Sequence, residues 1–294
     1  MSDNVEPGFQ PDLTEVEYRS LEAASSSGLS ALARSPAYYA WKRAQPDEPT
    51  EETLIGTATH AAILQPDLFL TRWATKPDDA PKRPDRRQRE AKKPSPETVA
   101  AIAWWDEFDK NNAAKVILTR EQYATVLRLR EACEKNKEAT DLLAACPERE
   151  RAALWVDPAS GALCKGRLDA MGGRSILDLK TVRDAGMIAY AAKDGGWHRQ
   201  EWMYRAGAFE CGWGGDDFAW IVLDKSDGPT EDACLVYRME RLWMEVAARE
   251  IAPLLALYRS CVRLQSWPKR VGGLLSCPPW LAKAGPVSME DEPL

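Results

Sequence analysis

The segment from residue 152 to residue 182 constrains the fold more than any other part of the chain. It contains three short apolar runs, which the tight-turn sequences PASG and GGR separate. Short runs rich in Val, Ile, Leu and Trp between turn residues are typical of neighbouring strands. The segment therefore predicts a three-stranded antiparallel meander, and two further strands are expected in residues 216–225 and 232–240.

Helical patterns surround these strands. The segments with helical spacing and capping residues are 25–43, 50–65, 96–110, 119–136, 184–193, 198–213 and 241–265. The sequence thus predicts an α/β (α+β) fold, in which helices flank a central mixed β-sheet of about five strands. We expect a flexible N-terminal arm over residues 1–20, a single domain over 21–265 and an irregular tail over 266–294. A basic loop over 74–98 interrupts the domain.

Composition excludes several classes of protein. The chain has 294 residues and a net charge of −6, so any binding of nucleic acid must rely on local basic patches. No apolar run is long enough to cross a membrane, and the acidic N-terminus does not resemble a secretory signal. The seven cysteines are scattered without a CxxC pair, which favours reduced thiols in a cytoplasmic protein.

Two carboxylates and an ammonium group interrupt the apolar meander. Asp178 and Lys180 are two residues apart on one predicted strand, so they face the same side, and Asp169 on the preceding strand can lie opposite them. Neighbouring carboxylates repel each other unless a cation lies between them, and Mg²⁺ prefers such oxygen ligands. Lys180 could then orient an attacking water. A surface ion pair on a half-exposed sheet would produce the same short pattern.

Four ordered motifs extend this pattern along the chain. They are GxxxH at Gly56–His60, GxxD at Gly166–Asp169, DxK at Asp178–Lys180 and QxxxY at Gln200–Tyr204. In this order they resemble the PD-(D/E)xK nuclease superfamily, in particular the RecE-like exodeoxyribonuclease VIII family. The resemblance covers roughly residues 25–263. It implies a restriction-endonuclease-like core.

The resemblance also implies roles for individual residues. Asp169 and Asp178 are expected to bind Mg²⁺ or Mn²⁺, with His60 and the carbonyl of Leu179 as further ligands, and Lys180 to activate water. A histidine suits Mn²⁺ better than Mg²⁺. By default, a histidine on an apolar helix would instead be a buried core residue.

Three further residues could belong to the same catalytic site. Glu150 corresponds to an acidic residue of the family, although its PERER context also suits a solvated charge cluster. Gln200 and Tyr204 are four residues apart and share one helical face, where the family places a pair that touches DNA or a catalytic water. The alternative is an amphipathic helix with a tyrosine in the core.

Contacts with DNA are expected at two places. Ser27 and Arg34 could bind phosphate, or serve only as a cap and a surface charge. Residues 81–93 contain seven basic and two acidic side chains, and could bind the duplex backbone or simply be solvated. The predicted DNA contacts of this loop are Lys82, Arg83, Arg86 and Arg87.

Some relatives carry an iron–sulfur cluster, but we expect none here. No cysteine precedes Cys133, and Cys261 and Cys277 are too far apart to form a clustered set of ligands.

The function implied by the resemblance is a processive 5′→3′ exonuclease that acts on the ends of linear double-stranded DNA. Its product would be a 3′ single-stranded tail for a RecT-like single-strand annealing protein. A ring-shaped homo-oligomer, a trimer or a tetramer, and a phage or bacterial cytoplasmic origin are also implied. The motifs leave open an endonuclease or a single-strand nuclease of the same superfamily, an inactive DNA-binding module, and a metal-dependent hydrolase of small molecules.

Overall fold

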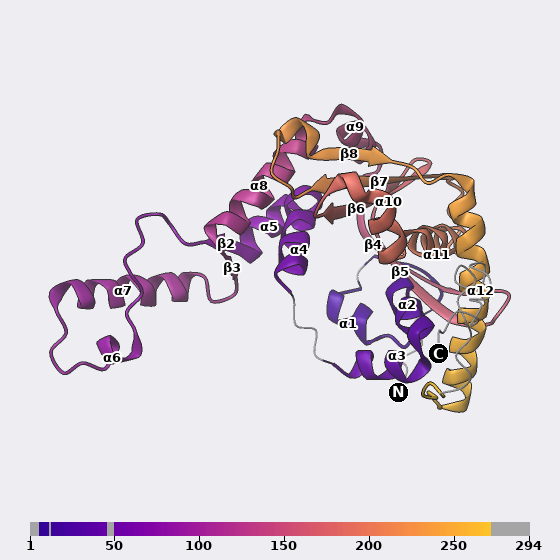
Figure 1. The fold of residues 1–294 in the computed structure, drawn as a ribbon, viewed down its shortest axis with the longest axis horizontal. Coiled ribbons are helices and arrows are strands. Elements are labelled where there is room, and N and C mark those ends of the chain that lie inside the picture. Colours follow the sequence, from indigo (N-terminus) through magenta and orange to yellow (C-terminus); the bar gives the residue numbers. More distant parts are fainter. Residues whose placement is uncertain (1–5, 12, 46–49, 272–294) are drawn as a thin grey trace, which may run out of the picture.

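The computed structural model describes residues 6–11, 13–45 and 50–271. Its centre is a six-stranded mixed sheet with the order β1-β4-β5-β6-β7-β8 (Figure 1). The strands are β1 Gly8–Gln10, β4 Glu148–Val156, β5 Leu163–Gly172, β6 Ser175–Val182, β7 Asp217–Asp224 and β8 Cys234–Tyr237. The predicted class, a mixed sheet flanked by helices, is confirmed.

The predicted meander is confirmed as β4, β5 and β6, which pair antiparallel in chain order. β7 then pairs parallel with β6 along its whole length, from Ser175 opposite Asp217 to Val182 opposite Asp224. Parallel neighbours need a crossover, and the helices between β6 and β7 provide it. β6 therefore lies inside the sheet, with a strand on each side.

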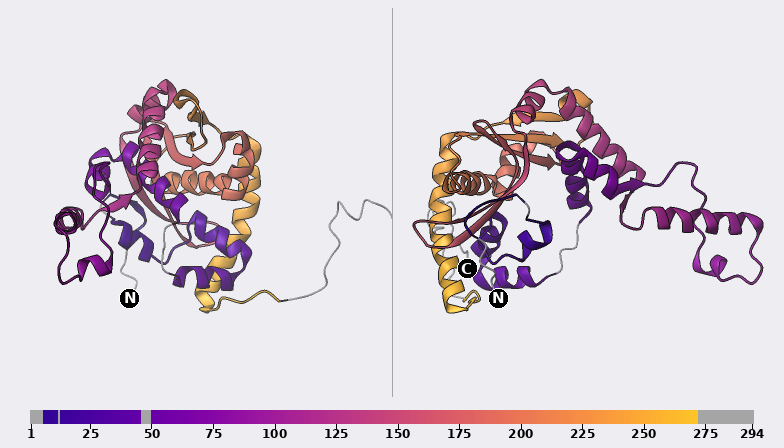
Figure 2. Two further views of the ribbon diagram at one scale, coloured as in Figure 1. Left: turned by 60° about the vertical axis from the view of Figure 1, so that its left-hand side comes forward. Right: turned by 180° about the vertical axis from the view of Figure 1, so that it is seen from behind.

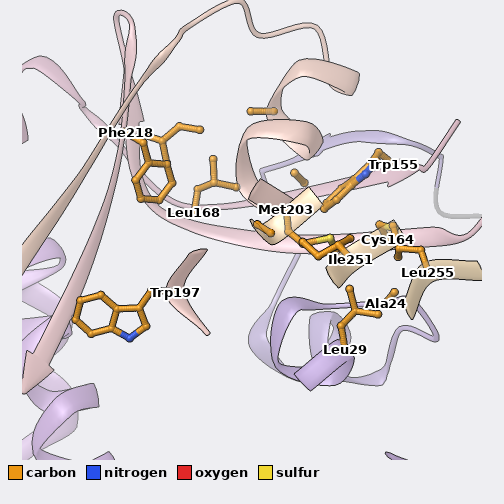
Figure 3. Close-up of a cluster of buried hydrophobic side chains, with 14 of the residues drawn as sticks. Ala24, Leu29, Trp155, Cys164, Leu168, Trp197, Met203, Phe218, Ile251 and Leu255 are labelled. Atoms are coloured by element: carbon orange, nitrogen blue, oxygen red, sulfur yellow. The ribbon is translucent and has the colours of Figure 1, made fainter. Parts of the chain in front are cut away.

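Five helices cover one face of the sheet. They are α2 Ser26–Arg34, α3 Pro36–Ala44, α10 Ile188–Gly195, α11 Trp197–Glu210 and α12 Arg241–Leu264. Figure 3 shows side chains from this layer, such as Leu29, Met203 and Ile251, around Trp155 and Leu168 of the sheet. Burial of this apolar surface holds the helices in place.

Three helices cover the opposite face. They are α4 Glu51–Leu64, α8 Arg120–Lys135 and α9 Lys137–Ala145. Leu129 and Ala139 from this layer pack with Leu177 and Leu179 of β6. The alternation predicted for β6 is therefore confirmed, because Leu177 and Leu179 face this layer while Ile176 and Val182 belong to the other. None of the helices in the described part of the chain combines the length and apolarity needed to cross a membrane.

An arm made of residues 76–115 projects from the body of the protein (Figures 1 and 2). It leaves a two-stranded parallel sheet, β2 Trp73–Thr75 and β3 Val116–Leu118, which follows α5 Pro66–Arg72. The arm contains α6 Arg86–Arg89 and α7 Pro96–Asn111. The sequence predicted only a basic loop and a helix here, so the strands and α6 were missed.

The N-terminal residues differ from the flexible arm that the sequence predicted. Gly8–Gln10 add β1 to the edge of β4, and Thr14 with Glu17 forms a capping box at the start of α1, Glu15–Ser20. The Lys165 ammonium fixes the other end of α1, donating hydrogen bonds to the carbonyls of Tyr18 (2.7 Å) and Leu21 (2.9 Å). The prediction failed because the main partners of this segment are backbone groups and residues more than a hundred positions away.

At the other end of the chain, the predicted tail falls partly outside the described residues, which end at residue 271. In the described part, Trp267 stacks on Tyr39 of α3 with ring centroids 4.7 Å apart. Pro268 accepts a hydrogen bond from the backbone amide of Ala37 (3.1 Å). The start of the tail is thus bound to α3.

Replacing Lys165 by Met should release α1 from the sheet. Lys165 is buried, so removal of its ammonium leaves carbonyl groups without a donor and should cost about 2 kcal/mol of the free energy of unfolding. Hydrogen exchange of residues 13–21 should become faster. Lys135→Met, at an exposed ion pair, is the matched control and should change neither quantity. Unchanged exchange in residues 13–21 of Lys165→Met would contradict this role.

Candidate metal centre in an open cleft

The site forms where β5 and β6 separate. The two strands pair from Gly172 opposite Ser175 to Ala170 opposite Leu177, and pairing stops there. In the same register, the next pair would be Asp169 and Asp178. The strands therefore diverge at the two aspartates, which leaves room between them for other groups.

A local distortion changes the direction of the strand residues beside Asp169. In a regular strand only residues an even number apart share a face, yet Leu168 and Met171 belong to the same apolar cluster. Glu150, at the neighbouring position on β4, has a φ of 52°, in the left-handed region. Non-glycine residues seldom adopt this conformation, and it often marks a functional site. The distortion allows Asp169 to lie near Asp178 on the α11 side.

Side chains from three elements meet at this point. His60 comes from α4, Glu150 from β4 and Asp169 from β5, and one potential ligand atom of each lies within 4.8 Å of the other two. His60 Nδ1 is 3.5 Å from Asp169 Oδ2. The backbone amide of Leu179 donates a hydrogen bond to the same oxygen (2.7 Å).

Asp178 is fully buried beside this group. The Gln200 amide donates a hydrogen bond to its Oδ1 (2.6 Å), and Lys180 forms an ion pair with its Oδ2. Lys180 also lies 5.3 Å from the centre of the Trp220 ring, and cations are attracted to aromatic faces. One carboxylate thus positions both Lys180 and Gln200.

Burial raises the pKa of every carboxyl group in the site, and repulsion by a neighbouring carboxylate adds to this for Asp178 and Glu150. Burial is the largest cause and raises the pKa of Asp169 to about 6, of Asp178 to about 7 and of Glu150 to about 8. The charge of Lys180 acts in the opposite direction on both aspartates. Asp169 is the main repelling neighbour for both Asp178 and Glu150. Burial and the charge of Lys180 lower the pKa of His60 to about 4, so its imidazole is neutral.

This donor set fits a divalent cation. Carboxylates that resist ionisation together need a positive charge between them, and a neutral imidazole has a lone pair for a metal. His60, Glu150, Asp169 and Asp178, with the carbonyl of Leu179, are the groups that would hold it. Carboxylate oxygens suit Mg²⁺ and Mn²⁺, and the imidazole favours Mn²⁺.

Two motif glycines allow the site to assemble. A Cβ on Gly166 would lie 3.1 Å from ring carbons of Tyr204, so the glycine lets the α11 tyrosine pack on β5. A Cβ on Gly56 would lie 3.3 Å from Thr181 Oγ1, so α4 can bring His60 close to β6. Tyr204 lines the same cleft as Asp169, and burial raises its pKa. The QxxxY pair therefore belongs to the site.

The predicted DNA contacts lie apart from the metal centre. Ser25, not Ser27, caps α2, and the Arg34 guanidinium lies 3.8 Å from the centre of the Tyr38 ring. In the arm, Arg83 pairs with Asp109 and Arg86 with Glu90. Lys82 and Arg87 are exposed, and no carboxylate of the described residues pairs with either. Their contacts with DNA remain predictions. Cys277, considered above for a cluster, is outside the described residues.

The site opens into a cleft of about 1330 Å³. Its walls include residues that the sequence interpretation missed: Glu15, Tyr18, Arg19, Arg72, Arg167, Arg183, Met187, Tyr190 and Lys225. Arg167 connects β5 to the N-terminal wall, pairing with Glu15 and donating to the carbonyl of Leu13 (3.0 Å). The position of Arg167 inside the GxxD motif was the only sequence signal for this contact.

Comparison with known proteins agrees with the fold. Residues 25–278 match a family described as a PDDEXK-like domain of unknown function, so the chain belongs to that family. The structure is similar to that of a "Putative exonuclease" from Eubacterium rectale, with a TM-score of 0.53, 14% identity, and coverage of 90% of this chain and 96% of the other. At this identity the similarity concerns the fold. No curated protein sequence matches the chain.

The carboxylate cluster makes stability depend on pH. In the folded protein the pKa values of Asp169, Asp178 and Glu150 lie above the ordinary values near 4, so the folded state binds protons more tightly than the unfolded state. The free energy of unfolding should therefore fall as pH rises from about 4 to about 8. In EDTA, we expect the Tm to fall by roughly 5 °C over this range. Mn²⁺ or Mg²⁺ should restore it most strongly at pH 8. Asp178→Asn should flatten the EDTA profile, whereas coincident profiles for the two proteins would contradict the repulsion.

The left-handed backbone of Glu150 can be tested separately from its charge. In EDTA at pH 8, both Glu150→Gln and Glu150→Gly remove the repelled carboxylate, but only glycine also relieves the backbone. Glu150→Gly should therefore be the more stable of the two by about 1 kcal/mol in urea denaturation. Both variants should bind Mn²⁺ about tenfold more weakly than the wild type. A glycine variant that is less stable than the glutamine variant would rule out backbone strain.

Proposed function

We propose that this chain is a divalent metal-dependent exodeoxyribonuclease that degrades linear double-stranded DNA. The observation that carries the proposal is the cluster of His60, Glu150 and Asp169 beside the Asp178–Lys180 pair, at the wall of an open cleft. The PDDEXK-like family and fold support a nuclease. Metal-assisted hydrolysis of DNA uses a metal site, a positioned cation and access for a polymer, and this arrangement offers all three.

Each group of the site would have a separate role in hydrolysis. A bound divalent ion would supply a water of lowered pKa and neutralise charge on the phosphate. Lys180 would orient the attacking water or stabilise charge that develops on the phosphate oxygens. Asp178 holds the Lys180 ammonium in place, and Gln200 fixes the Asp178 carboxylate from the other side.

The openness of the site supports a polymeric substrate. The cleft is lined by side chains of both signs, and four of its cations, Arg19, Arg72, Arg183 and Lys225, come from four separate segments. Such cations can neutralise backbone phosphates on either side of a scissile bond. Lys82 and Arg87 on the projecting arm are proposed to contact duplex further away.

The finer features of the proposal come from the resemblance to RecE-like exonucleases. They are 5′→3′ polarity, 3′ single-stranded products for a RecT-like annealing protein, a ring-shaped trimer or tetramer, and action in the cytoplasm of a bacterium or phage-infected cell. A closed ring would keep the enzyme on one DNA end and explain processive degradation.

The test is degradation of linear duplex labelled separately at its 5′ and 3′ ends, with Mg²⁺, Mn²⁺ or EDTA. We expect metal-dependent early release of the 5′ label, no cutting of closed circles, and a loss of at least about 100-fold in Lys180→Ala. Lys193→Ala, an exposed lysine outside the cleft, is the matched control.

The other outcomes of this test are equally informative. Cutting of circles would identify an endonuclease, and cleavage confined to single strands would identify a single-strand nuclease. Metal-dependent stabilisation without any cleavage would leave an inactive DNA-binding module as the better description.

A further inference from the structure

An apolar patch lies on the rim of the cleft, a few residues beyond the DxK motif. Met187 and Tyr190 both line the cleft, and they are 52% and 64% exposed. Met187 is the residue that caps the start of α10, and Tyr190 is the third residue of that helix. Neighbouring exposed apolar side chains can mark a ligand-binding groove, and a tyrosine there offers an aromatic face together with a polar hydroxyl.

Two cations flank this patch. Arg183 follows the last residue of β6, and Lys225 follows the last residue of β7, the strand parallel to β6. Both line the same cleft as Tyr190. Within residues 6–11, 13–45 and 50–271, neither forms an ion pair with a carboxylate. A flat apolar surface beside available cations is complementary to a nucleotide, which has an aromatic base and a charged phosphate.

We propose that Met187 and Tyr190 form a stacking site for one unpaired nucleobase next to the scissile phosphate, with Arg183 and Lys225 on the adjoining phosphate. Inside a duplex, both faces of a base are covered by its neighbours, so a base that stacks on Tyr190 has left the duplex stack. The site thus selects an end whose last nucleotides are unpaired. This inference rests on the proposed nuclease function and names the form of the substrate that the cleft accepts.

The position of the patch supports this assignment. The segment from Asp178 to Tyr190 runs from the metal centre along the end of β6 into α10, so the patch and the Lys180 ammonium line one continuous wall. Arg183 lies between Lys180 and Tyr190 in the chain, and all three side chains line the cleft. Stacking does not depend on base identity, because every base has a π-face, so the site suits a nuclease without sequence preference.

The test measures binding of a single-stranded oligodeoxyadenylate of about ten nucleotides, with Mg²⁺, by fluorescence anisotropy. All proteins carry Lys180→Ala so that the probe stays intact. Tyr190→Ala should weaken binding about tenfold, and Tyr190→Phe, which keeps the ring, should remain within about twofold. Phe209→Ala is the matched control, since Phe209 is 72% exposed on α11 but does not line the cleft.

A second probe of the same length, with abasic residues, separates stacking from other effects. It keeps the phosphates and lacks the bases, so Tyr190→Ala should bind it as tightly as the parent protein does. Equal weakening for both probes would overturn the stacking site, because it would indicate a general disturbance of the cleft.

The inference and the proposed function fail in different ways. If the protein degrades DNA but Tyr190→Ala binds the base-containing probe normally, the stacking site is wrong and the nuclease assignment stands. If the protein with Lys180 intact neither binds nor degrades DNA, both are wrong.

Discussion

The unfavourable burial of carboxylates where β5 and β6 diverge is the interaction on which the rest of the site depends. Asp169 and Asp178 would normally avoid each other, and Glu150 adds a third acid. The fold forces them together because both faces of the sheet are packed with apolar side chains that fix β5 and β6. The packing of the apolar clusters on the two faces of the sheet offsets the electrostatic cost of the carboxylate centre, which a bound cation would reduce.

Each group around the carboxylates is placed by a different part of the chain. α4 brings His60 through a close approach at Gly56, and α11 brings Gln200 and Tyr204 through a close approach at Gly166. The N-terminal segment closes another side of the cleft, where Lys165 and Arg167 bind its backbone carbonyls. The site is therefore a meeting point of elements that are distant in sequence, and no single element contains it.

The sequence predicted best the segment in which a strand pattern and the acidic and basic residues of the DxK motif occur together. The meander was predictable because its apolar runs alternate with turn residues, and the shared face of Asp178 and Lys180 follows from strand geometry alone. Glu150 could be named only as a candidate, because its left-handed backbone leaves no trace in composition. The role of residues 8–20 was missed because β1 is three residues long and depends on backbone pairing. Met187 and Tyr190 were overlooked because helical spacing does not distinguish an exposed face from a buried one.

The arm between β2 and β3 bears on how proteins of this kind can diverge. Pairing of Trp73 with Val116 closes the arm into a loop whose ends are fixed on the body of the protein. The entropy of closing a flexible loop rises only slowly, by about 0.6 kcal/mol for each doubling of length. Changes of length in the irregular segments that flank α6 and α7 should therefore cost little, while the same changes in β5 or β6 would displace the aspartates. The length of the arm can therefore change while the carboxylates stay in place.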